Sequence, residues 1–300
     1  MKILCIGQTT YDLNFPISHS FQKNRKYIIQ NLSQCPGGPA TNAAFLLASW
    51  GADTSLISRV GLDPFGQLIL SQMKDAGIST ESIYMDPKAS TSISCVIAHT
   101  SHGERTVFNA PAQETPFEPV WPQSDPDLIL VDGRETKTAL EALYRYPQAI
   151  SIMDAGSYQP WTKAVGSLVD YFVCSEDLSR SYTGAEIKLD KLEDLKPIFI
   201  RLHEITNHTI VITIGERGVV YEKDNKIYHI PAYPAHTIDT TGAGDIFHGA
   251  FTYFIGQNLP LPYAIRMASL TASISTETIG ALPSIPSLET VQKKKSEIKL

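Results

Sequence analysis

Long hydrophobic runs are absent from this sequence of 300 residues. A membrane-spanning helix needs about 18 consecutive apolar residues, and no run here approaches that length. The segment Met1–Gly7 begins directly with a strand-like pattern, without the hydrophobic region of a signal peptide. These absences exclude a membrane partner, and we expect the protein to be cytoplasmic.

The sequence also has few cysteines and no excess of positive charge. The four cysteines are far apart and form no Cys-x-x-Cys pair, which argues against a zinc site or a disulfide framework. With 25 basic and 31 acidic residues the formal net charge is -6, so the chain lacks the basic surface that neutralises nucleic-acid phosphates. The 43% hydrophobic content is that of a folded globular protein, for which we expect no nucleic-acid partner.

Several common chemical motifs are missing as well. The chain has no Gly-x-x-x-x-Gly-Lys-Ser/Thr phosphate loop, no Gly-x-Gly-x-x-Gly after its first predicted strand and no Gly-x-Ser-x-Gly. These absences argue against P-loop, dehydrogenase and hydrolase functions. His203 and His208 are five residues apart, so a helix would separate them by about 140° and they would not share a zinc ion.

From residue 127 onward, short apolar runs alternate with stretches of helical periodicity. This βαβ rhythm predicts an α/β fold with a mostly parallel sheet covered on both faces. The predicted strands are residues 2–6, 128–132, 149–153, 171–174 and 209–213, and the predicted helices are residues 41–50, 64–76, 136–146 and 190–206.

Two segments of the first half break this rhythm, residues 13–36 and 92–110. Both show strand-like alternation without an intervening helix, including Lys26–Gln30, Ser94–His99 and Thr106–Asn109. We expect them to form a small antiparallel sheet that projects from the main sheet as a lid. Residues 1–300 would then be a single catalytic domain with a discontinuous lid.

The most informative stretch is Gly242-Ala243-Gly244-Asp245, which precedes a run of apolar residues at helical spacing. Glycines at a helix start leave backbone N–H groups uncovered, and the helix dipole adds partial positive charge there. The stretch therefore predicts an anion site with a carboxylate in its first turn. A structural acid that only caps the helix is the alternative.

A second glycine turn, Gly37-Gly38, opens another predicted helix and has the polar Asn42 in its first turn. Asp12 lies just beyond the first predicted strand, at the edge where open α/β sheets bind ligands. Either feature alone is weak support for a binding site.

Together these stretches resemble the ribokinase-like (PfkB) carbohydrate kinases. The first motif is Gly38 with Asn42, and the second, some two hundred residues later, is 239–245 (Asp-Thr-Thr-Gly-Ala-Gly-Asp), which is the order found in that family. The resemblance runs from Gly7 to about Pro286. It implies a three-layer α/β/α core with a β-sheet lid, and transfer of the γ-phosphoryl group of ATP to a primary hydroxyl of a sugar. Mg²⁺ is the implied cofactor, K⁺ a further one, and a homodimer that pairs through the lid is implied as well.

Carried over residue by residue, the resemblance implies roles for three groups of residues. Asp245 matches the catalytic base, with Gly242, Ala243 and Gly244 as the anion hole. Residues matching sugar-hydroxyl binders are Asp12, Gly38 and Asn42, and those matching the nucleotide-side loop are Thr213, Gly215 and Gly218.

The metal sites are matched only in part. Asp239 and the backbone of Thr241 resemble part of the monovalent-cation site of many members. Where the family has an Asn-x-x-Glu motif, this chain has Ser175 and Leu178, so both polar positions are changed. Glu176 is then the candidate to reach Mg²⁺ through water.

The rim of the predicted site suggests a substrate class. Residues 103–111 and 130–134 resemble the ketohexokinase and sulfofructose kinase branch, with Asn109 and Arg134 as candidate substrate ligands. A guanidinium at Arg134 would bind an anionic group, which favours a ketose or an acidic ketose derivative. A salt bridge to Glu135 or to another rim acid is the alternative for Arg134. A nucleoside kinase and a non-catalytic sugar or nucleotide sensor remain alternatives for the whole protein.

Overall fold

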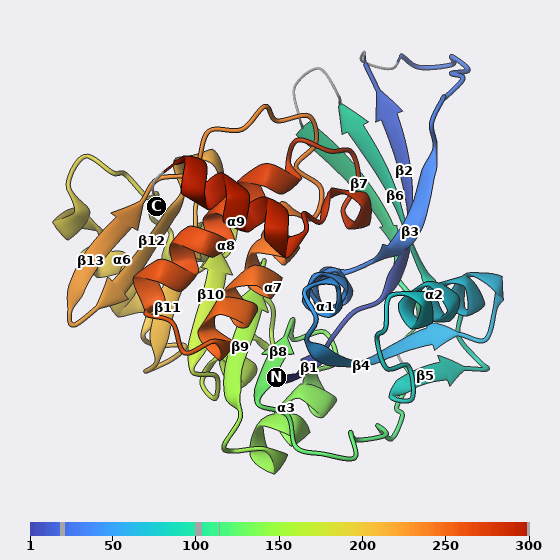
Figure 1. The fold of residues 1–300 in the computed structure, drawn as a ribbon, viewed down its shortest axis with the longest axis horizontal. Coiled ribbons are helices and arrows are strands. Elements are labelled where there is room, and N and C mark those ends of the chain that lie inside the picture. Colours follow the sequence, from blue (N-terminus) through green and yellow to red (C-terminus); the bar gives the residue numbers. More distant parts are fainter. Residues whose placement is uncertain (19–21, 100–103, 114, 299–300) are drawn as a thin grey trace.

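A computed structural model describes residues 1–18, 22–99, 104–113 and 115–298. Its nine-stranded sheet confirms the predicted α/β architecture, with all strands running in the same direction except β12, which pairs antiparallel with β11 and β13 near one edge (Figure 1). In spatial order the strands are β13 (Lys226–Ile230), β12 (Val219–Lys223), β11 (Thr209–Thr213), β10 (Tyr171–Ser175), β9 (Ile150–Ala155), β8 (Leu128–Val131), β1 (Lys2–Ile6), β4 (Asp53–Gly61) and β5 (Ile83–Asp86).

Helices cover both faces of this sheet. One face carries α1 (Pro39–Ser49), α7 (Ala243–Gly256), α8 (Leu261–Ser275) and α9 (Leu288–Glu297). The other face carries α3 (Thr136–Arg145), α4 (Thr162–Gly166), α5 (Glu176–Thr183) and α6 (Lys196–Leu202), while α2 (Pro64–Asp75) packs beside β4. Among the described residues, no helix has the length and apolar character that crossing a membrane requires.

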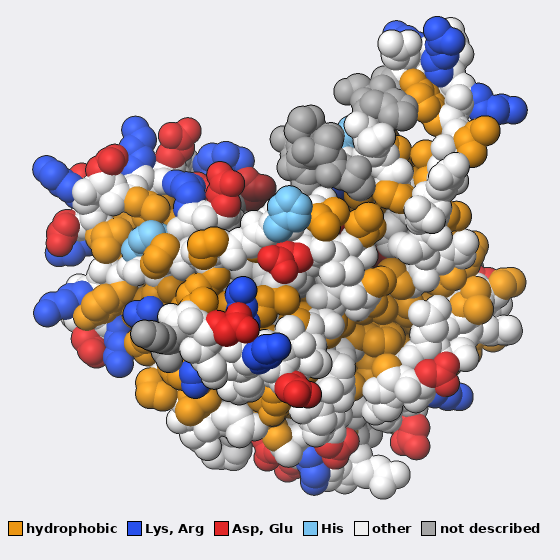
Figure 2. Space-filling model, turned by 45° about the horizontal axis from the view of Figure 1, so that its top comes forward, with side chains coloured by type: hydrophobic (Ala, Val, Ile, Leu, Met, Phe, Trp, Pro, Cys, Tyr) orange, Lys and Arg blue, Asp and Glu red, His pale blue; other side chains and the backbone are white. Residues whose placement is uncertain are grey.

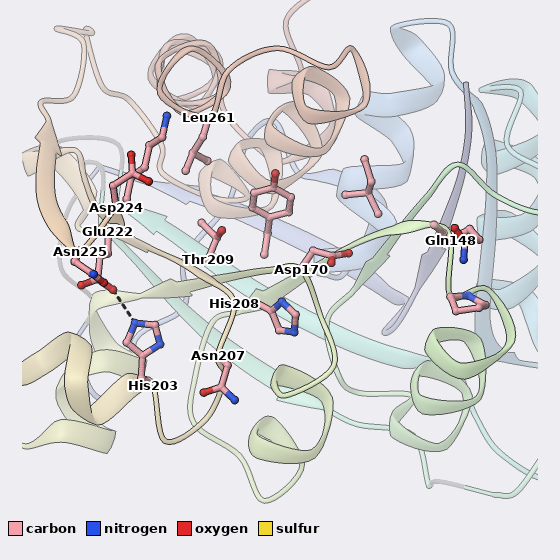
Figure 3. A pocket seen from close by; sticks show the side chains of 15 residues that line it. Gln148, Asp170, His203, Asn207, His208, Thr209, Glu222, Asp224, Asn225 and Leu261 are labelled. Carbon is pink, nitrogen blue, oxygen red and sulfur yellow. Dashed lines mark hydrogen bonds and ion pairs between the residues drawn. The ribbon is translucent and has the colours of Figure 1, made fainter.

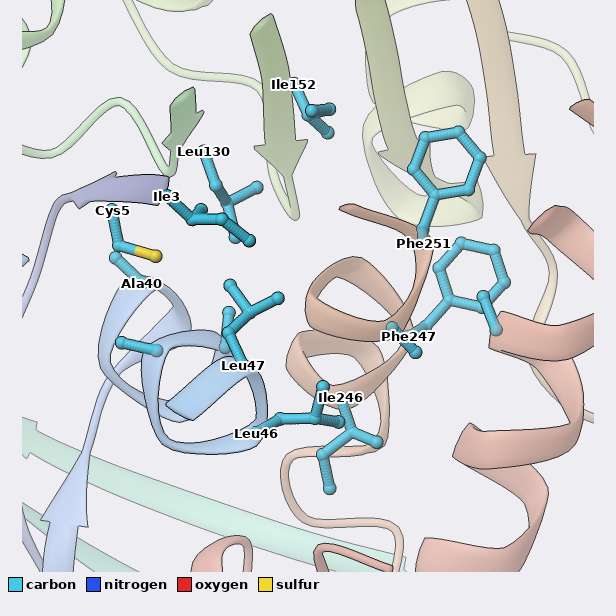
Figure 4. Packing of buried hydrophobic residues seen from close by; sticks show 14 of the residues in the cluster. Ile3, Cys5, Ala40, Leu46, Leu47, Leu130, Ile152, Ile246, Phe247 and Phe251 are labelled. Atoms are coloured by element: carbon cyan, nitrogen blue, oxygen red, sulfur yellow. The ribbon is translucent and has the colours of Figure 1, made fainter. Parts of the chain in front are cut away.

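Alternation along β1 shows why two helical layers form. Ile3 and Cys5 point into the core on the side of α1 and α7, whereas Leu4 and Ile6 join the core on the opposite side. All four side chains are at most 1% exposed. Figure 4 shows the first core, where Leu46 and Leu47 of α1 approach α7. Burial on both faces stabilises the sheet by about 25 cal/mol for each Å² of apolar surface removed from water.

One predicted helix is shorter than expected. Residues 190–206 form a 3₁₀ turn, η1 (Leu192–Leu195), and then α6 (Lys196–Leu202). Pro197 explains the break, because proline lacks the N–H of a helix interior but suits the first turn of a new helix.

The lid is a four-stranded sheet in the order β3 (Ser33–Gly37), β2 (Thr10–Ile17), β6 (Ser92–His99) and β7 (Glu104–Ala110), and it projects above the main sheet (Figure 1). The outer pairs are antiparallel as predicted, but β2 and β6 are parallel, so the expectation of a purely antiparallel sheet is wrong. They run the same way because β2 and β6 each continue upward from the main body. Lys26–Gln30 is not a strand, and the lid residues 19–21 and 100–103 lie outside the described chain.

Candidate active site

The first turns of α1 and α7 meet above the carboxyl edge of the parallel strands. The side-chain amide of Asn42 donates a hydrogen bond of 2.6 Å to Asp245 Oδ2. Asn42 is only 3% exposed. The two glycine-rich stretches, which are 203 residues apart at these positions, therefore form one site.

The first turn of α7 has the features of an anion site. Gly242 precedes the helix with a φ of 76°, and a side chain there would meet Ala281 Cβ at 2.5 Å. The first helical hydrogen bond runs from Ile246 N to Gly242 O, and the amide of Ala243 donates to Thr240 O at 3.2 Å. The amides of Gly244 and Asp245 precede that first helical bond, and Gly244 is exposed. These two amides are thus the ones placed to bind a phosphoryl group.

The Asp245 carboxylate sits in a charged, partly buried environment. Its pKa is raised to about 6 because burial and, after it, the nearby Asp154 charge favour the protonated form, while the hydrogen bond from Asn42 and the neighbouring His248 and Arg105 oppose the rise. A carboxyl group with such a pKa is ionised at neutral pH and is better matched to accept a proton than an ordinary aspartate.

The opposite wall of the site comes from the lid. Asp12 lies within β2 rather than in a loop after β1, is 7% exposed, and accepts a 2.6 Å hydrogen bond from Thr10 Oγ1. Burial raises its pKa, while hydrogen bonds from Thr10 and Ser94 lower it. The register pairs Asp12 with Ser94 and Ser94 with Asn109, so the three polar residues form one row across β2, β6 and β7. Such a row suits the hydroxyls of a sugar.

Gly38 joins the lid to α1. It precedes that helix with a φ of 101°, and a side chain at this position would collide with the carbonyl of Gln8. Only glycine combines this backbone conformation with so close an approach to the end of β1.

Arg134 follows β8 and is exposed at the rim, with its guanidinium 5.6 Å from the centre of the Trp161 ring. A salt bridge from Arg134 to Glu135 is wrong, because the Glu135 carboxylate binds Arg59 through two hydrogen bonds of 2.8 and 2.7 Å. Of the other rim acids, Asp132 has a pKa raised by burial to about 6, and the nearby Arg134 charge opposes that rise. Arg134 is therefore held by an aromatic face rather than by the Glu135 carboxylate.

Arg105 connects the lid to the loop before α7. Its Nη1 donates to Thr240 O at 2.7 Å and lies 3.1 Å from Thr240 Oγ1. Nothing in the sequence around Arg105 indicates this contact, because an arginine between two strands has many possible partners. Its positive charge also lowers the pKa of Asp245.

The predicted nucleotide-side loop follows β11 at the same edge of the sheet. Thr213 ends β11, and its hydroxyl contacts Cys174 O at 3.4 Å. Gly215 and Gly218 flank a short 3₁₀ turn, η2 (Gly215–Arg217), with φ values of 61° and 100°. The loop thus bends tightly back into β12.

The candidate metal ligands are occupied by protein contacts. Glu176 forms a salt bridge with Arg217, and Ser175 accepts a hydrogen bond from Leu178 N as the cap of α5. Asp239 accepts from the amide and hydroxyl of Thr241 and from Gly280 N, at 2.8, 2.6 and 2.8 Å. Within the described residues, no group of three His, Cys, Asp or Glu side chains is arranged to hold a metal ion.

Sequence reasoning also missed two acids, Asp132 and Asp154, which lie near the carboxyl ends of buried strands. Asp132 accepts hydrogen bonds from Gln8 N and Arg134 N at 2.7 and 2.9 Å, which ties β1 to β8. Asp154 is the second-to-last residue of β9, and burial, together with the Asp132 charge, raises its pKa to about 8. In the sequence, both residues could have been found as acids at the carboxyl end of an apolar run, where open α/β sheets bind ligands.

A separate hollow lies at the amino ends of β9, β10 and β11 (Figure 3). It has a volume of about 800 Å³ and is lined by residues such as Asp170, Asn207 and His208. His203 at its rim pairs with Glu222 at 2.7 Å. It is separated from Asp245 by the length of the strands and does not form part of this site.

Comparison with known proteins agrees with the geometry. A model of the pfkB family carbohydrate kinases matches residues 1–288. A ribokinase of Staphylococcus aureus is 25% identical over 303 residues, covering 97% of this chain and 99% of the relative, and a fructokinase of Klebsiella pneumoniae is 27% identical over 291 residues, covering 87% and 92%. The structure of Arabidopsis thaliana ribokinase complexed with ribose and ATP is 19% identical with a TM-score of 0.79, covering 97% of each chain.

These relatives correct one expectation. Ribokinases are among the curated relatives most similar to this chain, with a fructokinase and deoxyribokinases also among the matches, so the expected likeness to the ketohexokinase and sulfofructose kinase branch is not supported. Short rim segments were a poor guide because they contain few residues. With a family match across 1–288, the chain belongs to the pfkB carbohydrate kinases, ATP-binding phosphotransferases that act on an alcohol group.

Proposed function

We propose that this kinase transfers the γ-phosphoryl group of ATP to a primary hydroxyl of a small sugar, with Asp245 as the base. The observation that carries the proposal is the 2.6 Å contact between Asn42 and Asp245, which joins the sugar side of the site to the anion-binding turn. A hydroxyl held by Asn42, Asp12 and Asn109 would lie next to the Asp245 carboxylate.

The proposed mechanism follows from charge and proton affinity. A sugar hydroxyl has a pKa far above that of Asp245, so the carboxylate accepts the proton late, as the new O–P bond forms. The γ-phosphoryl group leaves ADP, and the amides of Gly244 and Asp245 stabilise the negative charge spread over its oxygens. The lid excludes water, which would otherwise compete with the sugar as acceptor.

Mg²⁺ would neutralise phosphate charge during transfer when it is bound with ATP. The expected protein ligand for it does not fit, because Glu176 is paired with Arg217 and Leu178 is apolar. These side chains therefore offer no protein ligand for a magnesium ion. For K⁺, Asp239 and the carbonyl of Thr241 offer hard oxygen atoms, although both carboxylate oxygens of Asp239 already accept hydrogen bonds.

The substrate class rests on the polar row of the lid and on Arg134. The sequence suggests a ketose or an acidic ketose as substrate, and the relatives named ribokinase and fructokinase make ribose and fructose further candidates. We infer that the substrate is a ketose or its acidic derivative, because the exposed Arg134 guanidinium, beside the Trp161 ring, is placed to bind an anionic group of a sugar.

A panel of acceptors tests this proposal. ADP formation is measured with ATP, Mg²⁺ and one acceptor at a time: D-ribose, D-fructose, a ketose bearing a carboxylate, and adenosine. Turnover of a ketose supports the substrate class, and activity with ribose or adenosine alone would overturn it. Independently, Asp245→Asn should lower kcat by about 10²- to 10⁴-fold, the usual contribution of a general base, and near-normal turnover would overturn its role.

A further inference from the structure

His248 lies one helical turn after Asp245, on α7, and the mechanism above does not use it. The residue is 3% exposed. Its Nδ1 lies 2.7 Å from Gly244 O, and its Nε2 lies 3.2 Å from Val173 O in β10. Asp154 Oδ2 of β9 is 3.2 Å from the same Nδ1. The imidazole thus connects the first turn of α7 to two strands of the main sheet.

The shorter of these contacts acts on the anion site itself. The carbonyl of Gly244 and the N–H of Asp245 belong to one planar peptide group, so a contact that holds the carbonyl also sets the direction of the N–H. That N–H precedes the first helical hydrogen bond of α7, so it is one of the two amides assigned above to the anion site. Gly244 has no side chain, and the space where one would lie is open. The Gly244 carbonyl is part of the helical ladder of α7, and the imidazole brings a second donor to it.

The same geometry fixes where the imidazole proton lies. A carbonyl oxygen only accepts hydrogen bonds, and both ring nitrogens lie near one, Nδ1 at 2.7 Å and Nε2 at 3.2 Å. A neutral imidazole has one N–H, and the shorter contact assigns that proton to Nδ1. Asp154 Oδ2 is buried, has no hydrogen-bond partner among the described residues, and lies beside that nitrogen. Asp154 Oδ2 can accept from Nδ1–H through its lone pairs, whether or not the carboxyl group carries a proton on Oδ1.

We propose that His248 is a positioning residue for phosphoryl transfer: by donating Nδ1–H to the Gly244 carbonyl, it holds the Asp245 amide toward the transferred phosphoryl group. This inference rests on the proposed function, because it takes the first turn of α7 as the phosphoryl site. Asp154 acts as the group that keeps the proton on Nδ1.

Two variants separate positioning from packing. His248→Asn keeps an N–H near the place of Nδ1, whereas His248→Leu fills similar space without a donor. For the sugar of the panel that turns over, His248→Leu should lower kcat by about 10- to 100-fold, the effect of a misplaced oxyanion donor, with KM changed by less than about threefold. His248→Asn should keep kcat within about fivefold of the wild type.

Thr252→Val is the matched control. Thr252 is fully buried one turn further along α7, and its hydroxyl donates to His248 O at 2.8 Å, away from Gly244. Loss of this hydroxyl should leave kcat within about twofold of the wild-type value, whatever the change in melting temperature. Equal kcat losses in His248→Leu and Thr252→Val, or in His248→Leu and His248→Asn, would overturn the proposal.

A measurement on the wild type does not depend on any variant folding. ¹⁵N NMR of the His248 ring, assigned by its loss in His248→Asn, should show a protonated Nδ1 at neutral pH, and an unprotonated Nδ1 would overturn the proposal. The two hypotheses also fail separately. Normal turnover by Asp245→Asn removes the proposed function, whereas an inactive Asp245→Asn beside a fully active His248→Leu removes only the positioning role.

Discussion

Asn42 and Asp245 are joined by a 2.6 Å hydrogen bond between the first turns of two helices. The amide donates to the carboxylate, so the contact stabilises the ionised form of Asp245, which is the form that accepts a proton. One interaction thus links substrate binding to the state of the proposed base.

Asn42→Ala should therefore lower kcat/KM by about 10- to 100-fold, since a hydrogen bond to a charged group contributes about 1.5–3 kcal/mol. Steady-state kinetics with the preferred sugar measure this loss. Ser49→Ala is the control, because it removes a hydroxyl that donates to Leu46 O at the other end of α1. A similar loss in both variants would indicate a general effect on the helix.

The pH dependence of the reaction should report on Asp245. Burial raises the pKa of this carboxyl to about 6, and the base must be ionised to act, so kcat/KM should fall as the pH drops below about 6. In Asn42→Ala the acid limb should move to higher pH, because the hydrogen bond that lowers the pKa is lost. A limb near pH 4 in the wild type would contradict this environment for Asp245.

The lid contact of Arg105 should contribute to turnover. Arg105→Ala removes the hydrogen bonds to Thr240, in the loop that precedes the anion site, and should lower kcat/KM by about tenfold. Lys26→Ala, which removes an exposed lid cation, is the matched control. If the two variants have equal kinetics, the contact has no role in closure of the lid.

Asp154 should make stability depend on pH. Its folded-state pKa is raised from 3.8 to about 8, so between these values the folded state binds the proton more strongly and stability falls as the pH rises. Asp154→Asn removes this titration, and its melting temperature relative to the wild type should increase from pH 5 to pH 9. The slope is at most about 1.4 kcal/mol per pH unit. Asp125→Asn, at an exposed position, should show no such trend.

Pairing of two copies through the lid is a further prediction. β3 and β7 are edge strands, and Val107 and Phe108 on β7 are 47% and 58% exposed, within a lid that projects from the molecule (Figure 2). Light scattering should find a dimer for the wild type and a monomer for Phe108→Glu. Tyr144→Glu, on α3 and 71% exposed, should remain dimeric. A monomeric wild type would contradict the prediction.

The local order of the chain was readable from its residues. The periodicity of residues 127–213 predicted the parallel strands, and the glycines before Asn42 and Asp245 marked two helix starts, because buried strands and helix termini have compositional requirements of their own. The family was also recognisable from these two stretches, since their residue types and order are specific.

Only the tertiary structure decided which side chains meet. The direction of β6 beside β2, the pairing of Glu176 with Arg217 and of Glu135 with Arg59, and the approach of Arg105 to Thr240 all join residues that are distant in sequence. Charged and polar groups accept many partners, and local pattern does not choose among them. The sequence thus determined the elements and the chemistry of the candidate site, and packing of α1, α7 and the lid on one sheet determined its geometry.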